Sequence, residues 1–356
     1  MRRGLLLSSL LLAACDNGNA LVQAKKHVAV PALGTINAKL AFSCVHERIP
    51  APPAEADILF QHARWLQKNN QLNQDKSVDE QIERLYRIAT EQGHHKASIN
   101  LQNGAIRGHF KLRGAENLRL SQQLIDAGVA TGYYFVAIFL QQGSAGLKQD
   151  QEMALRYYRK AADEGNAEAQ YYIAEKLAPS DIAPDIARRM HRCAAEQGHG
   201  KATVALGVNL KGMRQYQDAL EVFQLGVAAG HESAASRLSD AFRVPQPDDV
   251  IDYLSQQKDD ERADRYEKIW NVLAGYSYAN PKVPEINEIV PLPPVKLPPW
   301  DGKLQWLEER LANVPPPKPD ETLIRKLAND KQLDPITGRP LPASLHFTPV
   351  AAPKPR

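Results

Sequence analysis

Five copies of one short pattern constrain the fold of this chain more than any other feature of its sequence. Each copy has a glycine, a small residue four positions later and an aliphatic residue eight positions later. The glycines are 35, 37, 33 and 32 residues apart, which is the period of two-helix solenoid repeats. They are Gly93, Gly128, Gly165, Gly198 and Gly230.

The positions after each glycine predict how the helices pack. Residues four and eight positions on lie on one face of a helix, so the small residue lets a neighbouring helix approach and the aliphatic residue fills the groove beyond it. Each unit is therefore expected to be a helix, a glycine turn in the left-handed conformation and a second helix. The small residues are Ala97, Gly132, Ala169, Ala202 and Ala234.

Two units carry the pattern in its fullest form, as Ala162-x-x-Gly165-x-x-x-Ala169 and Ala195-x-x-Gly198-x-x-x-Ala202. This pattern resembles the Sel1-like repeat family, which is related to the tetratricopeptide repeat. The resemblance covers about residues 76–242. It implies an all-α fold, a right-handed α-solenoid of about five helix-turn-helix repeats whose concave surface binds proteins, and it implies no reaction.

The first residues have the features of a secretory signal. Arg2 and Arg3 precede the apolar run 5–12, which is too short to span a bilayer. The segment Leu12-Ala13-Ala14-Cys15 resembles a bacterial lipobox, which implies lipidation of Cys15 and a periplasmic domain anchored to a membrane by lipid alone. Asp16 resembles a signal for retention at the inner membrane. The alternative is an ordinary signal peptide with an incidental cysteine.

Composition changes sharply after the repeats, because 17 of the 25 prolines lie in the last 76 residues. Proline prevents helix over most of that stretch. Two amphipathic islands, 300–312 and 321–331, are expected to be short helices, and the tail to fold back along the solenoid or to become ordered on a partner. The expected division is 1–15 lipoprotein signal peptide, 16–53 tether and extended segment, 54–75 capping helix, 76–242 repeats, 243–280 capping helices and 281–356 proline-rich extension.

Two cysteines remain if Cys15 is acylated. Cys44 and Cys193 either pair or stay as two buried thiols. Sel1-like proteins built on disulfides usually carry cysteines inside each repeat, so the thiols are expected. Cys44 stands beside His46, and Cys193 beside His191, but neither group has a second ligand pair at a recognisable spacing, so no metal site is expected. Histidines that follow three of the repeat glycines, at 94, 199 and 231, are interpreted as tolerated turn residues.

Aromatic residues are concentrated in the second and third units. Adjacent residues of a helix point about 100° apart, so one member of each aromatic pair should be partly exposed and available to a protein partner. For the aromatic residues, the alternative is that they fill ordinary grooves between helices. For the arginines, the alternative is that they belong to a solvent-exposed helix face. The candidate partner-binding residues are Tyr133, Tyr134, Phe135, Tyr157, Tyr171, Arg84, Arg87, Arg156, Trp300 and Trp306.

Charge and motifs exclude several classes of function. Lysine and arginine number 44 against 41 acidic residues, so no basic stripe indicates nucleic acid. The chain has no P-loop, dinucleotide fingerprint, nucleophile elbow or HExxH motif. We therefore expect no enzyme activity, no cofactor and no small-molecule substrate.

A second resemblance spans nearly the whole chain. The lipobox, Cys44-Val45-His46-Glu47, the repeats, and the tail motifs at 299–307 and 333–338 are together similar to Sel1-repeat lipoproteins of pseudomonads. Some of these act as periplasmic immunity proteins against type VI secretion effectors of the phospholipase D class. The resemblance implies a protein that binds and neutralises such a lipase. The alternative is an envelope scaffold that assembles secretion, signalling or cell-wall proteins.

Overall fold

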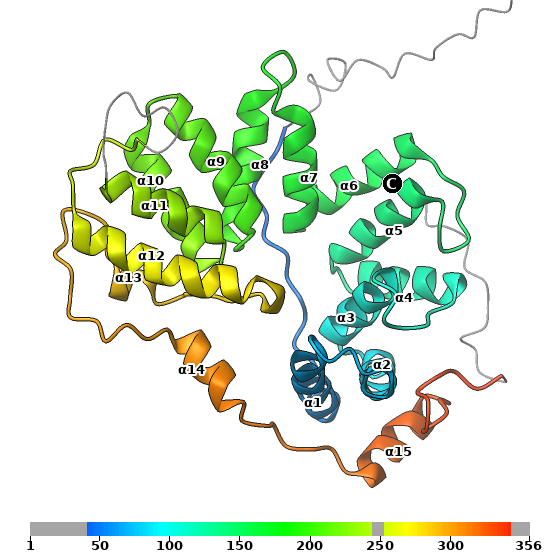
Figure 1. Cartoon of the computed structure of the whole chain (residues 1–356). Coiled ribbons are helices and arrows are strands. Elements are labelled where there is room, and N and C mark those ends of the chain that lie inside the picture. Colours follow the sequence, from blue (N-terminus) through cyan, green and yellow to red (C-terminus); the bar gives the residue numbers. More distant parts are fainter. Residues whose placement is uncertain (1–40, 244–252, 343–356) are drawn as a thin grey trace, which may run out of the picture. The chain divides into compact units, whose positions relative to one another are not determined.

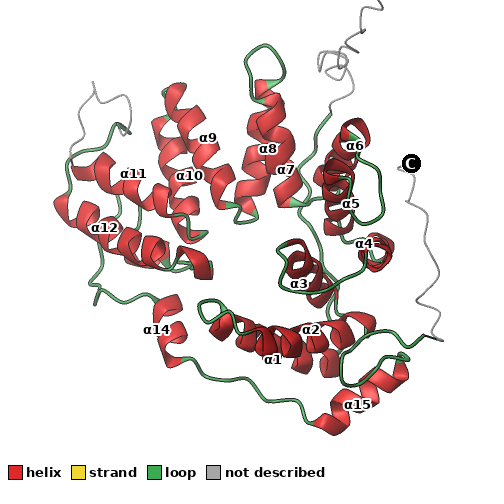
Figure 2. Cartoon of the chain, turned by 45° about the vertical axis from the view of Figure 1, so that its right-hand side comes forward, coloured by secondary structure: helices red, strands yellow, loops and turns green. Residues whose placement is uncertain are grey.

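The computed structural model describes residues 41–243 and 253–342, and the regular elements within these ranges are helices (Figure 2). None of those helices is both long and apolar enough to cross a membrane. The predicted lipidation site Cys15, with Asp16, lies outside the described residues. The all-α prediction is thus confirmed.

The helices follow one another as pairs. A first helix of each unit is called helix A and a second helix B; α1 precedes the units, and α12 to α15 follow them (Figure 1). The bounds are α1 Ala54–Asn70, α2 Lys76–Glu91, α3 His95–Ile106, α4 Gly114–Asp126, α5 Thr131–Gln142, α6 Gln151–Asp163, α7 Ala167–Leu177, α8 Pro184–Glu196, α9 Gly200–Gly212, α10 Tyr216–Ala228, α11 Glu232–Arg243, α12 Asp260–Gly275, η3 Ser277–Ala279, α13 Ile286–Ile289, α14 Gln305–Ala312 and α15 Glu321–Asp330.

The repeat pattern predicted the units α2–α3, α4–α5, α6–α7, α8–α9 and α10–α11 correctly. All five repeat glycines stand between helix A and helix B with φ between 73° and 104°, the left-handed turn that the pattern requires. The small residues four positions on are buried. At Gly132 even a Cβ atom would come 2.5 Å from the carbonyl oxygen of Ser121, because α4 and α5 pack in close contact there.

The residue after the glycine starts helix B. The side chains of His94, Asn166 and His199 each accept a hydrogen bond from the backbone N–H three residues on, at 3.1, 2.9 and 3.1 Å. An N-cap acceptor of this kind satisfies a donor that the helix leaves unpaired. His94 and His199 are therefore structural caps with Nδ1 as the acceptor, which gives a physical role to residues that the sequence marked only as tolerated. The third turn histidine, His231, differs, because its buried Nδ1 accepts no hydrogen bond within the described residues.

The last unit is covered by α12, whose Tyr266 stacks on Phe242 of α11 with ring centroids 6.0 Å apart. Capping helices were expected over 243–280. One of them is α12; residues 244–252 lie outside the described residues, and residues 253–259 are not helical. The proline-rich chain after α12 adds Val283, Ile286 and Leu304 to the same apolar core.

The C-terminal extension then returns to the first helices of the chain, as Figure 1 shows for α14 and α15. Ile324, Leu327 and Leu333 are buried in a core that α1 and α2 also supply, so the expectation that the tail folds back is confirmed. Helix α15 occupies the second predicted island. Helix α14 begins only at Gln305, because Trp300 Nε1 donates to the carbonyl of Lys303 and closes a turn ahead of it.

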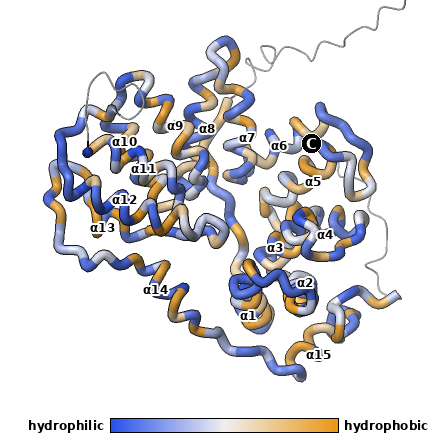
Figure 3. The backbone as a smooth tube through the Cα atoms, viewed as in Figure 1, coloured by the Kyte–Doolittle hydropathy of each residue, from blue (hydrophilic) through white to orange (hydrophobic). Residues whose placement is uncertain are grey.

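Hydropathy follows this arrangement. Figure 3 shows hydrophobic and hydrophilic positions alternating around the turns of each helix, as expected for helices that are buried on one side only. In the extension the hydrophobic positions are grouped at α13, α14 and α15, while the linkers between them are mostly hydrophilic. The linker between α13 and α14 nevertheless adds Val290 and Leu304 to the C-terminal core.

Candidate partner-binding surfaces

An extended segment before α1 lies across the middle units. We call residues 41–53 the strap; Figure 1 shows it in blue, running past α7 and α8 toward α1. Its backbone is paired with the solenoid at several points. Glu47 N–H donates to the carbonyl of Gly165 at 3.1 Å, and Gln170 Nε2 donates to the carbonyl of Val45 at 2.9 Å. The sequence predicted an extended segment within 16–53, and its described part, 41–53, is extended.

The carboxylate of Glu47 fixes the strap at the start of α5. It accepts hydrogen bonds from the backbone N–H of Thr131 at 2.5 Å and from the Thr131 hydroxyl at 2.8 Å. An anion at a helix N-terminus is favoured by the helix dipole and by the unpaired N–H groups. The strap also passes so close to the turn at Gly165 that a Cβ there would lie 2.6 Å from the Glu47 nitrogen.

A disulfide joins the strap to α8. Cys44 and Cys193 are bonded although they are 149 positions apart. The expectation of two buried thiols is wrong, because Cys44 stands on an extended segment that the repeat pattern does not place. His46 lies beside the bond, with Nε2 3.4 Å from Glu196 Oε2. The strap therefore covers this part of α6 and α8, a surface that the sequence left free for a partner.

Several aromatic candidates are buried. Phe135 is fully buried and Tyr157 is 1% exposed, so in this structure neither reaches a partner. Tyr158 is only 3% exposed, which contradicts the expectation that one residue of each adjacent pair is exposed. Helix α6 packs against both α5 and α7, and both faces are covered. Burial raises the pKa of Tyr157 to about 12, which keeps its hydroxyl neutral.

The other aromatic candidates of these units are half-buried. Tyr133 and Tyr134 sit beside the α6 tyrosines, with Tyr134 5.8 Å from Tyr158 between ring centroids. Tyr171 stacks on the cap residue His199 at 4.6 Å. These rings fill grooves between units and leave part of one edge exposed, which favours the packing role over a partner contact.

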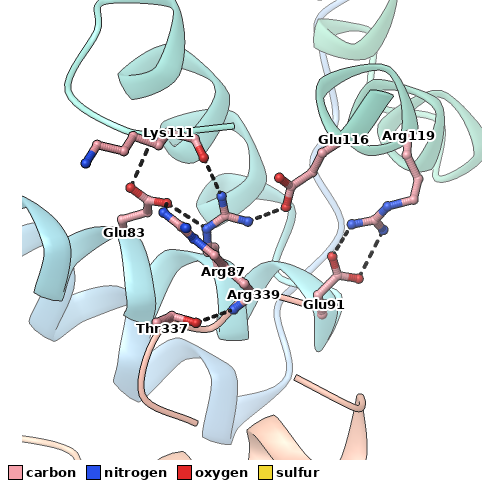
Figure 4. Close-up of polar contacts among 8 residues, drawn as sticks. All are labelled: Glu83, Arg87, Glu91, Lys111, Glu116, Arg119, Thr337 and Arg339. Atoms are coloured by element: carbon pink, nitrogen blue, oxygen red, sulfur yellow. Dashed lines mark hydrogen bonds and ion pairs between the residues drawn. The ribbon is translucent and has the colours of Figure 1, made fainter. Parts of the chain in front are cut away.

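Arg87 is buried in a polar network rather than on a rim, as Figure 4 shows. Its guanidinium contacts the carboxylates of Glu83 and Glu116 and donates to the carbonyl of Lys111 at 2.9 Å. Glu83 in turn lies 3.7 Å from Arg339 of the tail. The network joins α2, α4 and the tail, so the assignment of Arg87 to partner binding is corrected to a structural role.

Arg84 and Trp300 are likewise engaged within the chain. Arg84 donates to the carbonyl of Pro335 at 2.6 Å and pairs with Glu321 of α15. Trp300 is half-buried against the C-terminal core, with the Arg265 guanidinium 5.9 Å from its ring. Arg156 remains exposed and pairs with Glu152 one turn earlier on α6.

The first and last parts of the solenoid meet at α14. Asn313 donates from Nδ2 to Asn69 Oδ1 at 2.8 Å, and Gln71 Nε2 donates to the carbonyl of Tyr278 at 3.4 Å. The indole of Trp65 also approaches the carbonyl of Asn313, at 3.4 Å. Residues from α1, from the turn after α12 and from α14 are thus side by side.

Arg310 of α14 is surrounded by aromatic rings at this meeting point. Its guanidinium lies 5.7, 5.4 and 5.6 Å from the ring centroids of Tyr276, Tyr278 and Trp306. Trp306 also makes an edge contact with Tyr276 at 5.7 Å. Each cation–π contact of this kind contributes about 0.5–1 kcal/mol at an exposed site, so the three together favour this arrangement of the side chains. The sequence selected Trp306 as a partner residue, and the structure places it in this cluster.

Exposed apolar side chains flank the cluster. Tyr278 is 43%, Leu311 64% and Val314 76% exposed, and Leu72 at the end of α1 is 69% exposed. We call these four residues, together with Trp306 and Arg310, the junction surface. The sequence pattern does not single out Leu72, Tyr278, Leu311 and Val314, because they lie in or near the ends of elements that are far apart in sequence. A weak signal was present, since large apolar residues in a proline-rich, otherwise polar tail have no core of their own to fill.

Comparison with known proteins agrees with this architecture. The Sel1 repeat family model matches residues 130–166 and 167–199, and the domain of unknown function DUF6396 matches residues 234–341. The second match joins the last repeat helix, α12 and the extension into one unit. No curated protein matches the chain.

Three solved structures from Pseudomonas aeruginosa are similar over most of their length. Immunity protein Pa5087 is 25% identical with a TM-score of 0.54, covering 71% of this chain and 95% of that one. Immunity protein PA5088 is 25% identical with a TM-score of 0.54, over 72% and 95%. The protein PA5086 is 26% identical with a TM-score of 0.52, over 71% and 95%. The chain therefore carries Sel1 repeats over residues 130–199 within an all-helical fold, and it is similar in sequence and in fold to immunity proteins of Pseudomonas aeruginosa.

Proposed function

We propose that this chain is a periplasmic, lipid-anchored immunity protein that binds a lipase effector of the phospholipase D class, delivered by type VI secretion, and blocks it. The observation that carries the proposal is the similarity to two immunity proteins across 95% of their length. The repeat fold supports it, because such solenoids present extended surfaces to proteins. On this proposal the chain acts by binding and performs no reaction.

The lipobox-like segment ending at Cys15 supports the location. A lipid anchor would keep the protein at the membrane surface that a lipase must reach. Tethering raises the local concentration of one partner near the other without adding any contact. Asp16 favours the inner membrane as the place of attachment.

The junction surface is the proposed contact for the effector. The strap covers part of α6 and α8, and the tail is attached to α2, so both of these regions are engaged within the chain. The junction surface instead combines aromatic residues and an arginine held in place with exposed aliphatic neighbours. Interfaces concentrate their binding energy in such residues, because rigid rings lose little entropy on binding.

A competition experiment tests the function. Cells lacking the chain are grown against a sister strain that delivers the effector, and survival is compared with cells complemented by the full chain. The proposal predicts loss of survival without the chain and recovery with it. A Cys15→Ala variant that reaches the periplasm but lacks the anchor should protect less well at equal abundance. Equal survival with and without the chain would reject the immunity role and leave the envelope scaffold.

A further inference from the structure

The strap brings together four side chains that can bind a metal ion. The ligand atoms of Cys44, His46 and Cys193 all lie within 4.8 Å of one another. Glu196 adds a carboxylate oxygen 3.4 Å from His46 Nε2 and 3.8 Å from Cys44 Sγ. We propose that these four residues form a zinc site when the Cys44–Cys193 disulfide is reduced.

The donor set fits zinc. Zinc is usually bound tetrahedrally by cysteine sulfur, histidine nitrogen and carboxylate oxygen at about 2.0–2.3 Å, so two of its ligand atoms lie about 3.3–3.8 Å apart. The ligand atoms of the observed cluster lie within 4.8 Å of one another, so the farthest of them need to approach by about 1 Å. The two sulfurs must separate from their bonded distance, and Cys44 has room to move because it stands exposed on the strap.

Access and anchoring also fit. Cys193 is 1% exposed and fixed within α8, whereas the side chains of His46 and Glu196 are 50% and 43% exposed. Glu196 is the last residue of α8, three positions after Cys193, so the two point to the same side of the helix. Cys193 therefore provides a fixed ligand, and His46 and Glu196 leave the site accessible to an ion from solvent.

The chemistry balances with a dithiol as the reductant. The dithiol attacks the protein disulfide, and the S–S bond takes two electrons and two protons to give two thiols while the reductant becomes a cyclic disulfide. Binding of zinc then displaces the two thiol protons to solvent, because the thiolates are the ligands. The strap is joined to α8 in both states, by the disulfide in one and by the ion in the other.

Metal titration of the purified, folded chain tests the proposal. Protein stripped of metal by a chelator is titrated with Co²⁺ and then Zn²⁺, once oxidised and once after reduction by a dithiol followed by its removal without oxygen. The reduced protein should bind one ion per chain with the strong visible bands of tetrahedral, thiolate-bound cobalt. The oxidised protein should show none of these bands.

Variants identify the ligands. Cys44→Ser should weaken the thiolate bands and Cys44→Ser/Cys193→Ser should abolish them. His46→Ala should weaken zinc affinity by about 10- to 100-fold, the loss that even an outer hydrogen-bond partner causes. The control is His109→Ala, because His109 is 49% exposed and lies beside a carboxylate, Asp79, without a nearby sulfur. It should bind zinc as the parent does.

Three results would overturn the proposal. One is equal binding by the oxidised and reduced proteins, and another is an affinity that His46→Ala leaves unchanged. The third concerns folding: a Cys44→Ser/Cys193→Ser variant is checked for helix content by circular dichroism. If that variant and the reduced chain both lose their helices, and zinc restores none in the reduced chain, the site does not form.

Discussion

Arg84 of α2 and Glu321 of α15 form a two-pronged ion pair, with hydrogen bonds of 3.1 and 2.7 Å between guanidinium and carboxylate. The same guanidinium donates to the carbonyl of Pro335. A residue that the repeat pattern places on a helix A surface thus holds the tail against the first unit. The pair joins segments 237 positions apart and adds a polar contact to the apolar packing of α15.

Arg84→Ala should loosen the tail. It removes charge-assisted hydrogen bonds to two tail groups, one of them on the largely exposed Glu321, so we expect local docking to weaken by about 1–2 kcal/mol. Hydrogen exchange of α15 amides should become about tenfold faster or more. Arg156→Ala is the control, because its ion pair with Glu152 lies within α6. Unchanged exchange in Arg84→Ala would show that the apolar contacts of α15 suffice.

Acid should weaken the same docking. The hydrogen bonds from Arg84 hold the pKa of Glu321 below its usual value. The pair's stabilisation is therefore fully present above the unfolded carboxyl pKa of about 4.3 and is lost as the pH falls through the lowered folded value. Exchange of α15 should speed up on acidification below that point, and the acid-dependent part should be smaller in Arg84→Ala. Identical pH profiles in the two proteins would contradict the assignment.

Two glycine substitutions separate the strap contact from the turn itself. Gly165 and Gly198 both have positive φ, at 104° and 80°, so alanine strains both turns. Only at Gly165 would the Cβ collide with the strap, 2.6 Å from Glu47 N; at Gly198 nothing lies within 4 Å. Gly165→Ala should therefore speed disulfide reduction and proteolysis of the strap, whereas Gly198→Ala should lower stability by about 1 kcal/mol without releasing it. Equal strap protection in the two variants would count against this packing.

His94→Asn should reduce the pH dependence of stability. Burial lowers the pKa of His94, so the folded chain resists its protonation. Its contribution is complete above the unfolded pKa of about 6.5 and declines as the pH falls from there to the lowered folded value. Asparagine caps the same position in the third unit, through Asn166, and does not titrate. The unfolding midpoint in denaturant should depend less on pH in this variant, and His109→Asn should behave as the parent.

The repeat register is predictable because it is local. Gly165 and Ala169, four residues apart, encode a turn and a packing face within one unit, and the same physics acts in every unit. The N-cap role of His94 could also have been predicted, because Asn166 stands at the equivalent position and asparagine is a strong N-cap residue. Recurrence alone left the histidine unexplained, and the backbone geometry supplies the reason.

Contacts between distant segments were not predictable in the same way. Nothing near Cys44 indicates that the strap passes α8, because an extended segment has no period that records its neighbour. The junction surface was missed for the same reason, since Tyr278 and Arg310 come into contact only where the tail returns toward α1. Arg87 was wrongly assigned to partner binding for a related reason, because its ion-pair partner Glu116 lies in α4, 29 positions away.

Binding between the purified chain and its effector tests the central claim most directly, with Tyr278→Ala compared with Val208→Ala. The two residues are 43% and 41% exposed, and Val208 lies on α9, outside the junction surface. The account predicts tight binding by the parent and by Val208→Ala, and a loss of at least about tenfold for Tyr278→Ala, as for an aromatic residue central to an interface. Binding that Tyr278→Ala leaves intact would contradict the proposed surface, and the absence of binding by the parent chain would contradict the immunity function itself.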